Sequence, residues 1–213
     1  MKETEGNVFF SGGLALLLLV FVAGLFGGCK KKAAEGAGEL PKIAGKKVVM
    51  IIASNDFRDE ELLEPRTIIK DAGGEVVVAS SSLETATGMK GATFKPEMLL
   101  KDVKADEYDA VVFVGGSGAK EYWNDLTAHS LAKSAAEKGK LVCAICIAPV
   151  TLANAGLLEG KKATVWKGNA TALKQKGATY TGADVETDGK FITADGPESA
   201  AKFGRAIVRA LGG

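Results

Sequence analysis

The sequence predicts an α/β fold with a doubly wound, mostly parallel sheet and helices on both of its faces. Apolar runs rich in valine and isoleucine alternate along the chain with segments that have one apolar face. This alternation is typical of strand–helix–strand units. The runs are nearly free of polar residues, as strands buried on both faces are. In such a sheet, ligands bind beyond the carboxyl ends of the strands.

Strands and helices alternate regularly through the first half of the globular region. The run at 47–53 is continuous and apolar, and Gly73 and Gly74 end the helix that follows it. The predicted elements are a strand at 47–53, a helix at 60–72, a strand at 75–80, a short hairpin arm at 88–94 and a strand at 108–114.

The second half continues this alternation and adds an antiparallel pair. Pro149 suits the first turn of a short helix, which Gly156 closes. The predicted elements are a helix at 130–138, a strand at 141–145, a short helix at 150–155, a strand at 162–166, a helix at 170–176, two antiparallel strands around Val185 and 191–193, and a helix at 199–211.

The first 29 residues differ in composition from the rest of the chain. No charged residue occurs from Gly6 to Gly28, and this stretch exceeds the about 20 apolar residues that cross a bilayer. It ends in Phe26-Gly27-Gly28-Cys29 and resembles a bacterial lipoprotein signal, in which Cys29 is lipidated and becomes the new N-terminus. We therefore expect a membrane-anchored, extracytoplasmic lipoprotein. The alternative is an inner-membrane anchor with a cytoplasmic domain, because lysines follow the apolar segment directly.

The chain therefore divides into three parts. Residues 1–29 form a lipoprotein signal peptide or a transmembrane anchor, and residues 30–45 form a flexible linker rich in Lys, Ala, Gly and Glu. The globular domain occupies residues 46–213.

Composition excludes several classes of function. The net charge of +1 indicates no nucleic-acid partner. The single histidine, His129, cannot build a multi-histidine metal site, and we expect no metal or other cofactor. The three cysteines, Cys29, Cys143 and Cys146, are too few for a disulfide framework.

Cys146 is the strongest chemical signal in the sequence. It follows an apolar strand and precedes a helix, where backbone N–H groups and the helix dipole stabilise a thiolate. The alternative is an ordinary buried cysteine. Two other loops also follow predicted strands, at 54–61 and 115–118, so the topology directs an acid, backbone amides and a thiol to one edge of the sheet.

Several motifs in order resemble the DJ-1/PfpI family of class I glutamine amidotransferase-like proteins. Residues 142–149 and 152–161 are similar to the family's nucleophile elbow and the helix after it. Asp56-Phe57 with Glu61 and Pro65 matches its first-loop acid. Residues 111–116 resemble its Gly-Gly turn, and 193–197 its late strand-to-helix turn. The resemblance runs from about Lys46 to the C-terminus and implies a flavodoxin-like, class I glutamine amidotransferase-like fold and a homodimer or higher homo-oligomer.

The resemblance also implies roles for individual residues. Cys146 would be a reactive thiolate on a strained turn, and Glu61 its protonated carboxyl partner. Without the resemblance, Glu61 would be a solvated acid in the first turn of a helix. The backbone N–H groups of Gly116 and Ile147 would bind an oxyanion.

Other residues are expected around the site. Trp166 and Gly115 would line the pocket. Asp195 either lines the pocket or serves in ordinary packing, and Trp123 has the same two alternatives. Cys143 is expected to be a core residue, because the two cysteines of the C-x-x-C pair lie about 10 Å apart in a strand, beyond the roughly 7 Å limit for a disulfide.

The sequence departs from the family pattern at the general base. Many catalytic members carry a histidine directly after the nucleophile or at the end of the next strand, where this chain has Ile147 and Trp166. His129 is expected at the surface near the start of a helix. A Cys–His dyad is therefore poorly supported.

These features favour a membrane-tethered protein whose Cys146–Glu61 pair handles small electrophiles or oxidants, either as a glyoxalase- or deglycase-like enzyme or as an oxidative-stress thiol. Such a pair predicts a lowered pKa of the Cys146 thiol. One alternative is a non-catalytic stress-response or binding module of the same fold. The other is a cysteine peptidase or amidase of the PfpI type.

Overall fold

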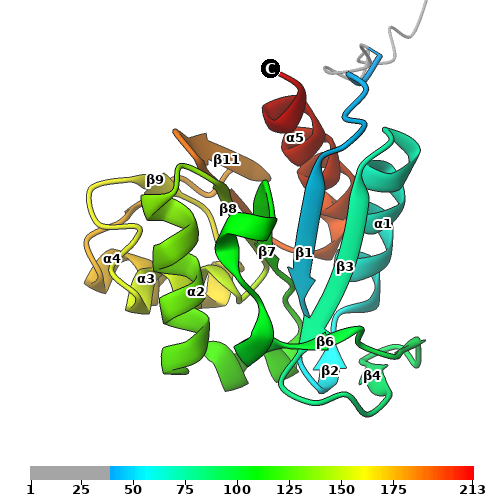
Figure 1. The fold of residues 1–213 in the computed structure, drawn as a ribbon. Coiled ribbons are helices and arrows are strands. Elements are labelled where there is room, and N and C mark those ends of the chain that lie inside the picture. The colour runs from blue at the N-terminus through cyan, green and yellow to red at the C-terminus, as the bar shows by residue number, and fades with distance from the viewer. Residues whose placement is uncertain (1–38) are drawn as a thin grey trace, which may run out of the picture. The chain divides into compact units, whose positions relative to one another are not determined.

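The computed structural model describes residues 39–213, in which a central sheet carries helices on both faces (Figure 1). The sheet has seven strands in the order β11-β12-β8-β7-β1-β3-β6, and every neighbouring pair is parallel except β11 and β12. This order confirms the predicted doubly wound, mostly parallel sheet. The strands are β1 (Lys47–Ile51), β3 (Glu75–Ser80), β6 (Met98–Leu99), β7 (Ala110–Phe113), β8 (Leu141–Ile145), β11 (Val185–Asp188) and β12 (Phe191–Ala194).

Helices α1 and α5 pack side by side on one face of the sheet, and α2 and α3 lie on the other (Figure 1). The contact between α1 and α5 needs a glycine, because a Cβ at Gly204 would lie 2.8 Å from Pro65 Cα. The helices are α1 (Asp59–Asp71), α2 (Leu126–Glu137), α3 (Pro149–Asn154), α4 (Ala170–Gln175) and α5 (Ala200–Gly212). Short 3₁₀ helices are η1 (Leu100–Asp102), η2 (Ala105–Glu107), η3 (Ser117–Tyr122), η4 (Lys167–Asn169) and η5 (Pro197–Ser199).

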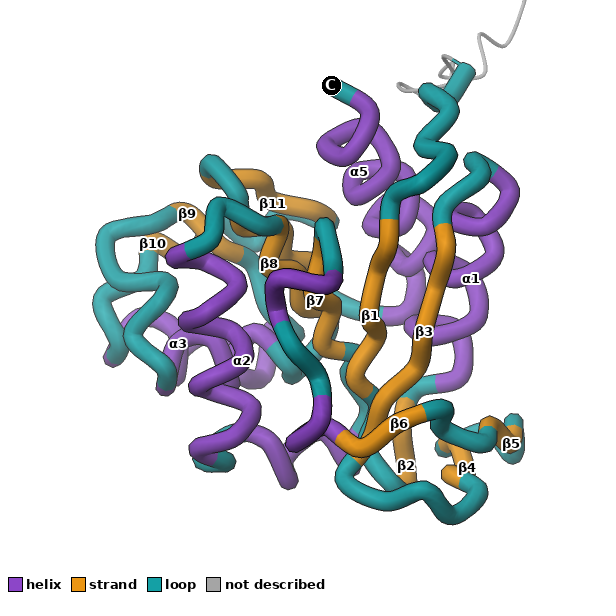
Figure 2. Tube along the Cα trace, viewed as in Figure 1, coloured by secondary structure: helices purple, strands orange, loops and turns teal. Residues whose placement is uncertain are grey.

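Two small sheets accompany the main one. Strands β9 (Lys162–Ala163) and β10 (Thr179–Tyr180) pair in parallel, and β2 (Asn55–Phe57), β4 (Ala86–Gly88) and β5 (Thr93–Phe94) form the other. Figure 2 shows this second small sheet near the carboxyl end of β1. The β4–β5 pair is the predicted hairpin arm, and the buried Asp59 carboxylate fixes its turn by accepting the N–H groups of Lys90 (2.9 Å) and Ala92 (2.7 Å).

The central strands are buried almost completely. All residues of β7, β8 and β12 are buried, and in β1 only Lys47 is exposed. This agrees with their unbroken apolar sequences, because both sheet faces are covered by helices. This buried core holds the carboxyl ends of β1, β7 and β8 in place, and the three loops singled out in the sequence leave from these ends.

The structure differs from the sequence prediction at several element ends. Helix α2 begins at Leu126, before the predicted start at Ser130, because the Asp125 side chain caps it by accepting the Ala128 N–H at 2.7 Å. Residues just before the predicted domain start at Lys46 also pack against the domain. Ile43 is buried there, and its N–H donates to the Ala72 carbonyl at 2.8 Å.

The apolar N-terminal segment and Cys29 lie outside the described residues. Among residues 39–213, none of the helices combines the length and the apolar character that crossing a bilayer requires.

Candidate functional site

Cys146 lies on a sharp turn between β8 and α3. Its φ of 61° places it in the left-handed region, which a non-glycine residue rarely adopts. The turn is held from both sides, because the Cys146 N–H donates to the Ala194 carbonyl (2.9 Å) and the Cys146 carbonyl accepts the Trp166 N–H (2.8 Å). Backbone strain of this kind costs about 1–3 kcal/mol and persists only where neighbours impose it.

Glu61 points inward from the first turn of α1. Its side chain is fully buried, and neither carboxyl oxygen has a regular hydrogen-bond partner among residues 39–213. The adjacent Glu60 behaves differently, since it pairs with Arg58 at 2.8 Å and Lys90 at 2.7 Å. Glu61 is therefore not a solvated surface acid, and the polar groups that favour its charged form are the Cys146 thiol, the Arg58 guanidinium and the Gly115 N–H.

Gly115 separates the carboxyl group from the cysteine. A Cβ at this position would lie 2.4 Å from Glu61 Oε2 and 2.6 Å from Cys146 Cβ. The next residue, Gly116, has a φ of 99° and passes so close to the first loop that a Cβ would lie 2.3 Å from the Asp56 carbonyl oxygen. The absence of side chains at both glycines lets the acid and the thiol approach each other.

Burial dominates the electrostatics of this pair. It raises the pKa of Glu61 to about 8, although the thiol and the Gly115 N–H partly oppose the rise. Burial, together with the neighbouring Glu61, raises the pKa of Cys146 to about 12, while the N–H groups of Gly116 and Ile147 act in the opposite direction. The lowered thiol pKa predicted from the sequence is therefore wrong, because desolvation and the carboxyl group outweigh the two amides. At neutral pH both groups mostly hold their protons.

A cavity of about 660 Å³ opens in front of the thiol. The predicted residues Glu61, Gly116, Ile147 and Trp166 line it together with Cys146. Trp123 lines it too, which is the first of its two predicted alternatives. The remaining lining residues, which carry no individual signal in the sequence, are Arg58, Met89, Ser117, Lys120, Asn169, Pro197 and Glu198.

Three residues named from the sequence do not line this cavity. Gly115 lies between Glu61 and Cys146 instead. Asp195 does not line it; its Oδ1 accepts the Ser199 hydroxyl at 2.6 Å. The His129 ring bonds the Trp123 carbonyl oxygen through Nε2 at 3.0 Å and does not line the cavity. Cys143 is buried and its thiol is free. In the described part of the chain, no three His, Cys, Asp or Glu side chains gather as metal ligands would.

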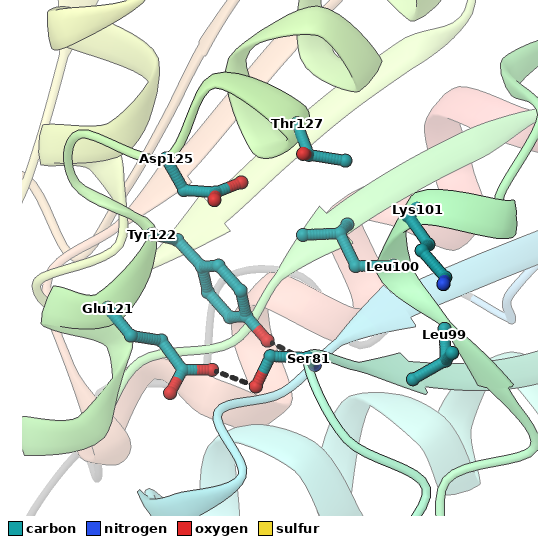
Figure 3. A pocket seen from close by; sticks show the side chains of 8 residues that line it. All are labelled: Ser81, Leu99, Leu100, Lys101, Glu121, Tyr122, Asp125 and Thr127. Atoms are coloured by element: carbon teal, nitrogen blue, oxygen red, sulfur yellow. Dashed lines mark hydrogen bonds between the residues drawn. The ribbon is translucent and has the colours of Figure 1, made fainter.

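A second cavity, of about 320 Å³, lies beside η3 (Figure 3). Glu121 Oε1 accepts the Ser81 hydroxyl at 3.0 Å there, and the Tyr122 hydroxyl accepts the Ser81 N–H at 3.0 Å and donates to the Ile52 carbonyl at 2.8 Å. These bonds tie the loops after β1 and β3 to η3. The cavity shares no lining residue with the one at Cys146, and its polar groups serve structure.

The sequence matches the model of the DJ-1/PfpI family over residues 46–210. It is 44% identical to an uncharacterized protein of Methanocaldococcus jannaschii, over 78% of this chain and 82% of that protein. It is 31% identical to a deglycase of Pyrococcus horikoshii, over 76% of this chain and 98% of that protein. The crystal structure of a ThiJ/PfpI domain protein from Brachyspira murdochii has a TM-score of 0.76 and 33% identity, over 78% of this chain and 98% of that one.

Proposed function

Since this chain belongs to the DJ-1/PfpI family, we propose that it is a deglycase-like enzyme whose Cys146–Glu61 pair acts on small reactive aldehydes and their adducts. The observation that carries the proposal is the buried Glu61 carboxyl against the Cys146 thiol, with a pKa of about 8. A proton carrier works best when its pKa lies near the working pH. The similarity to a deglycase over nearly all of that protein's length supports the same chemistry.

The chemistry begins with addition of the thiol to the aldehyde carbon. A carbon–sulfur bond forms, the ionised Glu61 takes the thiol proton, and the proton then passes to the former carbonyl oxygen. The N–H groups of Gly116 and Ile147, which already face the sulfur, stabilise developing negative charge.

With an α-oxoaldehyde, Glu61 then moves a proton from the former aldehyde carbon to the adjacent ketone carbon, and the hydroxyl proton on the first carbon passes to the ketone oxygen. The first carbon is oxidised to a thioester and the second is reduced to an alcohol, so no external oxidant is needed. Water cleaves the thioester to a 2-hydroxy acid and restores the thiol.

A peptidase or amidase mechanism has less support. The two positions where the family pattern carries a histidine hold Ile147 and Trp166, and the His129 ring is engaged with the Trp123 carbonyl. Glu61 is therefore the titratable group beside the thiol that can carry the proton.

Conversion of methylglyoxal to lactate tests this function directly. In the Cys146→Ser variant the rate is expected to fall to background, because a hydroxyl is a much weaker nucleophile than a thiol. The His129→Gln variant is the matched control, and its kcat/KM is expected to stay at the wild-type value. Equal turnover by the wild type and Cys146→Ser would contradict the proposal.

We also propose that the domain is tethered to a membrane through its N-terminal segment. Mass spectrometry of the protein purified from membranes is expected to give a chain that begins at a lipidated Cys29. A chain that begins at Met1 would instead support the uncleaved anchor. Recovery of the protein only from the aqueous fraction would overturn both. The homodimer or higher homo-oligomer implied by the family resemblance stays a prediction.

A further inference from the structure

Both tryptophans of the chain line the Cys146 cavity, but they differ in how they are held. The Trp123 indole N–H donates to the Ile147 carbonyl at 3.1 Å, and the Lys120 ammonium lies 5.9 Å from the centre of its ring. The Trp166 indole N–H has no acceptor among residues 39–213, and half of this residue (50%) is exposed. Trp123 therefore forms a fixed wall, whereas Trp166 presents a free aromatic surface.

Trp166 is nevertheless held in place beside the nucleophile. Its backbone N–H donates to the Cys146 carbonyl (2.8 Å), and its backbone carbonyl accepts the Asn169 N–H (2.7 Å). Two glycines lie against the indole, where a Cβ would come within 3.1 Å at Gly196 and 3.4 Å at Gly168. An aromatic ligand can therefore meet this ring without a large rearrangement of the site.

The size and polarity of the cavity also suit an aromatic ligand. Its volume of about 660 Å³ lies within the ~300–1,000 Å³ of pockets that hold drug-sized ligands. A three-carbon aldehyde fills a small part of such a space. Met89 and Ile147 add apolar surface, and the charge of Arg58 is already engaged by Glu60 at 2.8 Å.

We propose that the Cys146 cavity selects aldehydes that carry a flat aromatic group next to the reactive carbonyl, and that Trp166 is the residue that selects them. The aromatic group lies against the exposed indole while the carbonyl carbon meets the thiol. This inference rests on the proposed aldehyde chemistry for its kinetic consequence, and on the geometry of Trp166 alone for the binding of the ring.

Kinetics with phenylglyoxal and methylglyoxal test the selection. The wild-type kcat/KM is expected to be higher for phenylglyoxal, and Trp166→Ala is expected to lower it for phenylglyoxal by about two- to tenfold, as the loss of one aromatic pair does. The value for methylglyoxal should change less. Trp166→Phe should retain the preference. Leu126→Ala, which alters a residue that is 79% exposed and outside the cavity, is the control. An undiminished preference in Trp166→Ala would overturn the inference.

Binding of an unreactive ring separates this inference from the proposed function. Acetophenone and acetone are titrated into the full-length wild-type protein while the two indole N–H resonances are followed by NMR, with Trp166→Phe assigning them. Acetophenone is expected to shift the Trp166 resonance, and acetone is not. If neither aldehyde is turned over but acetophenone shifts this resonance, the proposed function fails and the selective surface stands. If acetophenone leaves the resonance unchanged, the inference is wrong.

Discussion

Replacing Glu61 by glutamine is expected to lower the rate at which Cys146 adds to aldehydes by about 10²–10⁴-fold, the usual contribution of a positioned general acid or base. Glutamine keeps the size of the side chain but cannot take or return a proton. Single-turnover kinetics with methylglyoxal measure the addition step. A rate equal to or above that of the wild type would show that Glu61 restrains the thiol rather than carrying its proton.

The pH dependence of the Glu61→Gln variant gives a second readout. In the wild type the addition rate should rise as pH increases through about 8, where Glu61 becomes ionised and can accept the thiol proton. The same shift affects stability. The folded state holds the proton more tightly than the unfolded chain, so the wild type should lose stability as pH rises from 4.5 to about 8. Both effects should disappear in Glu61→Gln.

Glu60→Gln is the matched control for these measurements. This neighbouring carboxyl pairs with Arg58 and Lys90, which offset the cost of its partial burial and hold its pKa at about 2. It does not line the Cys146 cavity. The Glu60→Gln variant should therefore keep the rise in addition rate near pH 8. Its retention in this variant and its loss in Glu61→Gln would assign the rise to Glu61.

Replacing Gly115 by alanine is expected to destabilise the domain and abolish aldehyde addition together. The new Cβ would lie 2.4 Å from Glu61 Oε2, 2.6 Å from Cys146 Cβ and 2.8 Å from the Ile145 carbonyl oxygen. Because two of these three atoms belong to the elbow itself, they cannot move aside as the end of a flexible side chain can. Overpacking of this kind costs about 1–3 kcal/mol, and here it also separates the acid from the thiol.

Urea denaturation and single-turnover kinetics measure the two effects of Gly115→Ala. Gly168→Ala is the stability control, because its Cβ would meet only the Trp166 ring at 3.4 Å. A Gly115→Ala protein with wild-type stability and rate would show that the elbow is not close-packed around the pair.

The sheet and the nucleophile turn were predictable because their signals are local. A strand buried on both faces reads as an unbroken apolar run, as at β8, and the turn after it carries its own motif. The start of α2 was missed because a cap depends on one side chain, here Asp125, rather than on a repeating pattern. The predicted strand at 162–166 is longer than β9, which ends at Ala163. An apolar run does not show where the pairing with a neighbouring strand stops.

The candidate site was less predictable because it depends on direction and burial. Asp59, Glu60 and Glu61 are three consecutive acids in the first turn of α1, yet each has a different role. The first fixes the hairpin turn, the second pairs with cations and the third faces the thiol. Only their orientation in space separates them, and the raised thiol pKa follows from that orientation rather than from the order of residues.

The buried, uncharged resting pair also has a consequence for chemical selectivity. A peroxide or an alkylating reagent reacts with a thiolate, and a thiol whose pKa is about 12 offers very little of it at neutral pH. An aldehyde brings its own proton acceptor, the carbonyl oxygen, so Glu61 can complete the transfer during the attack. Under the proposed function, the protonated resting thiol should therefore react slowly with oxidants and alkylating reagents while still adding to aldehydes, whose carbonyl oxygen can take up the thiol proton.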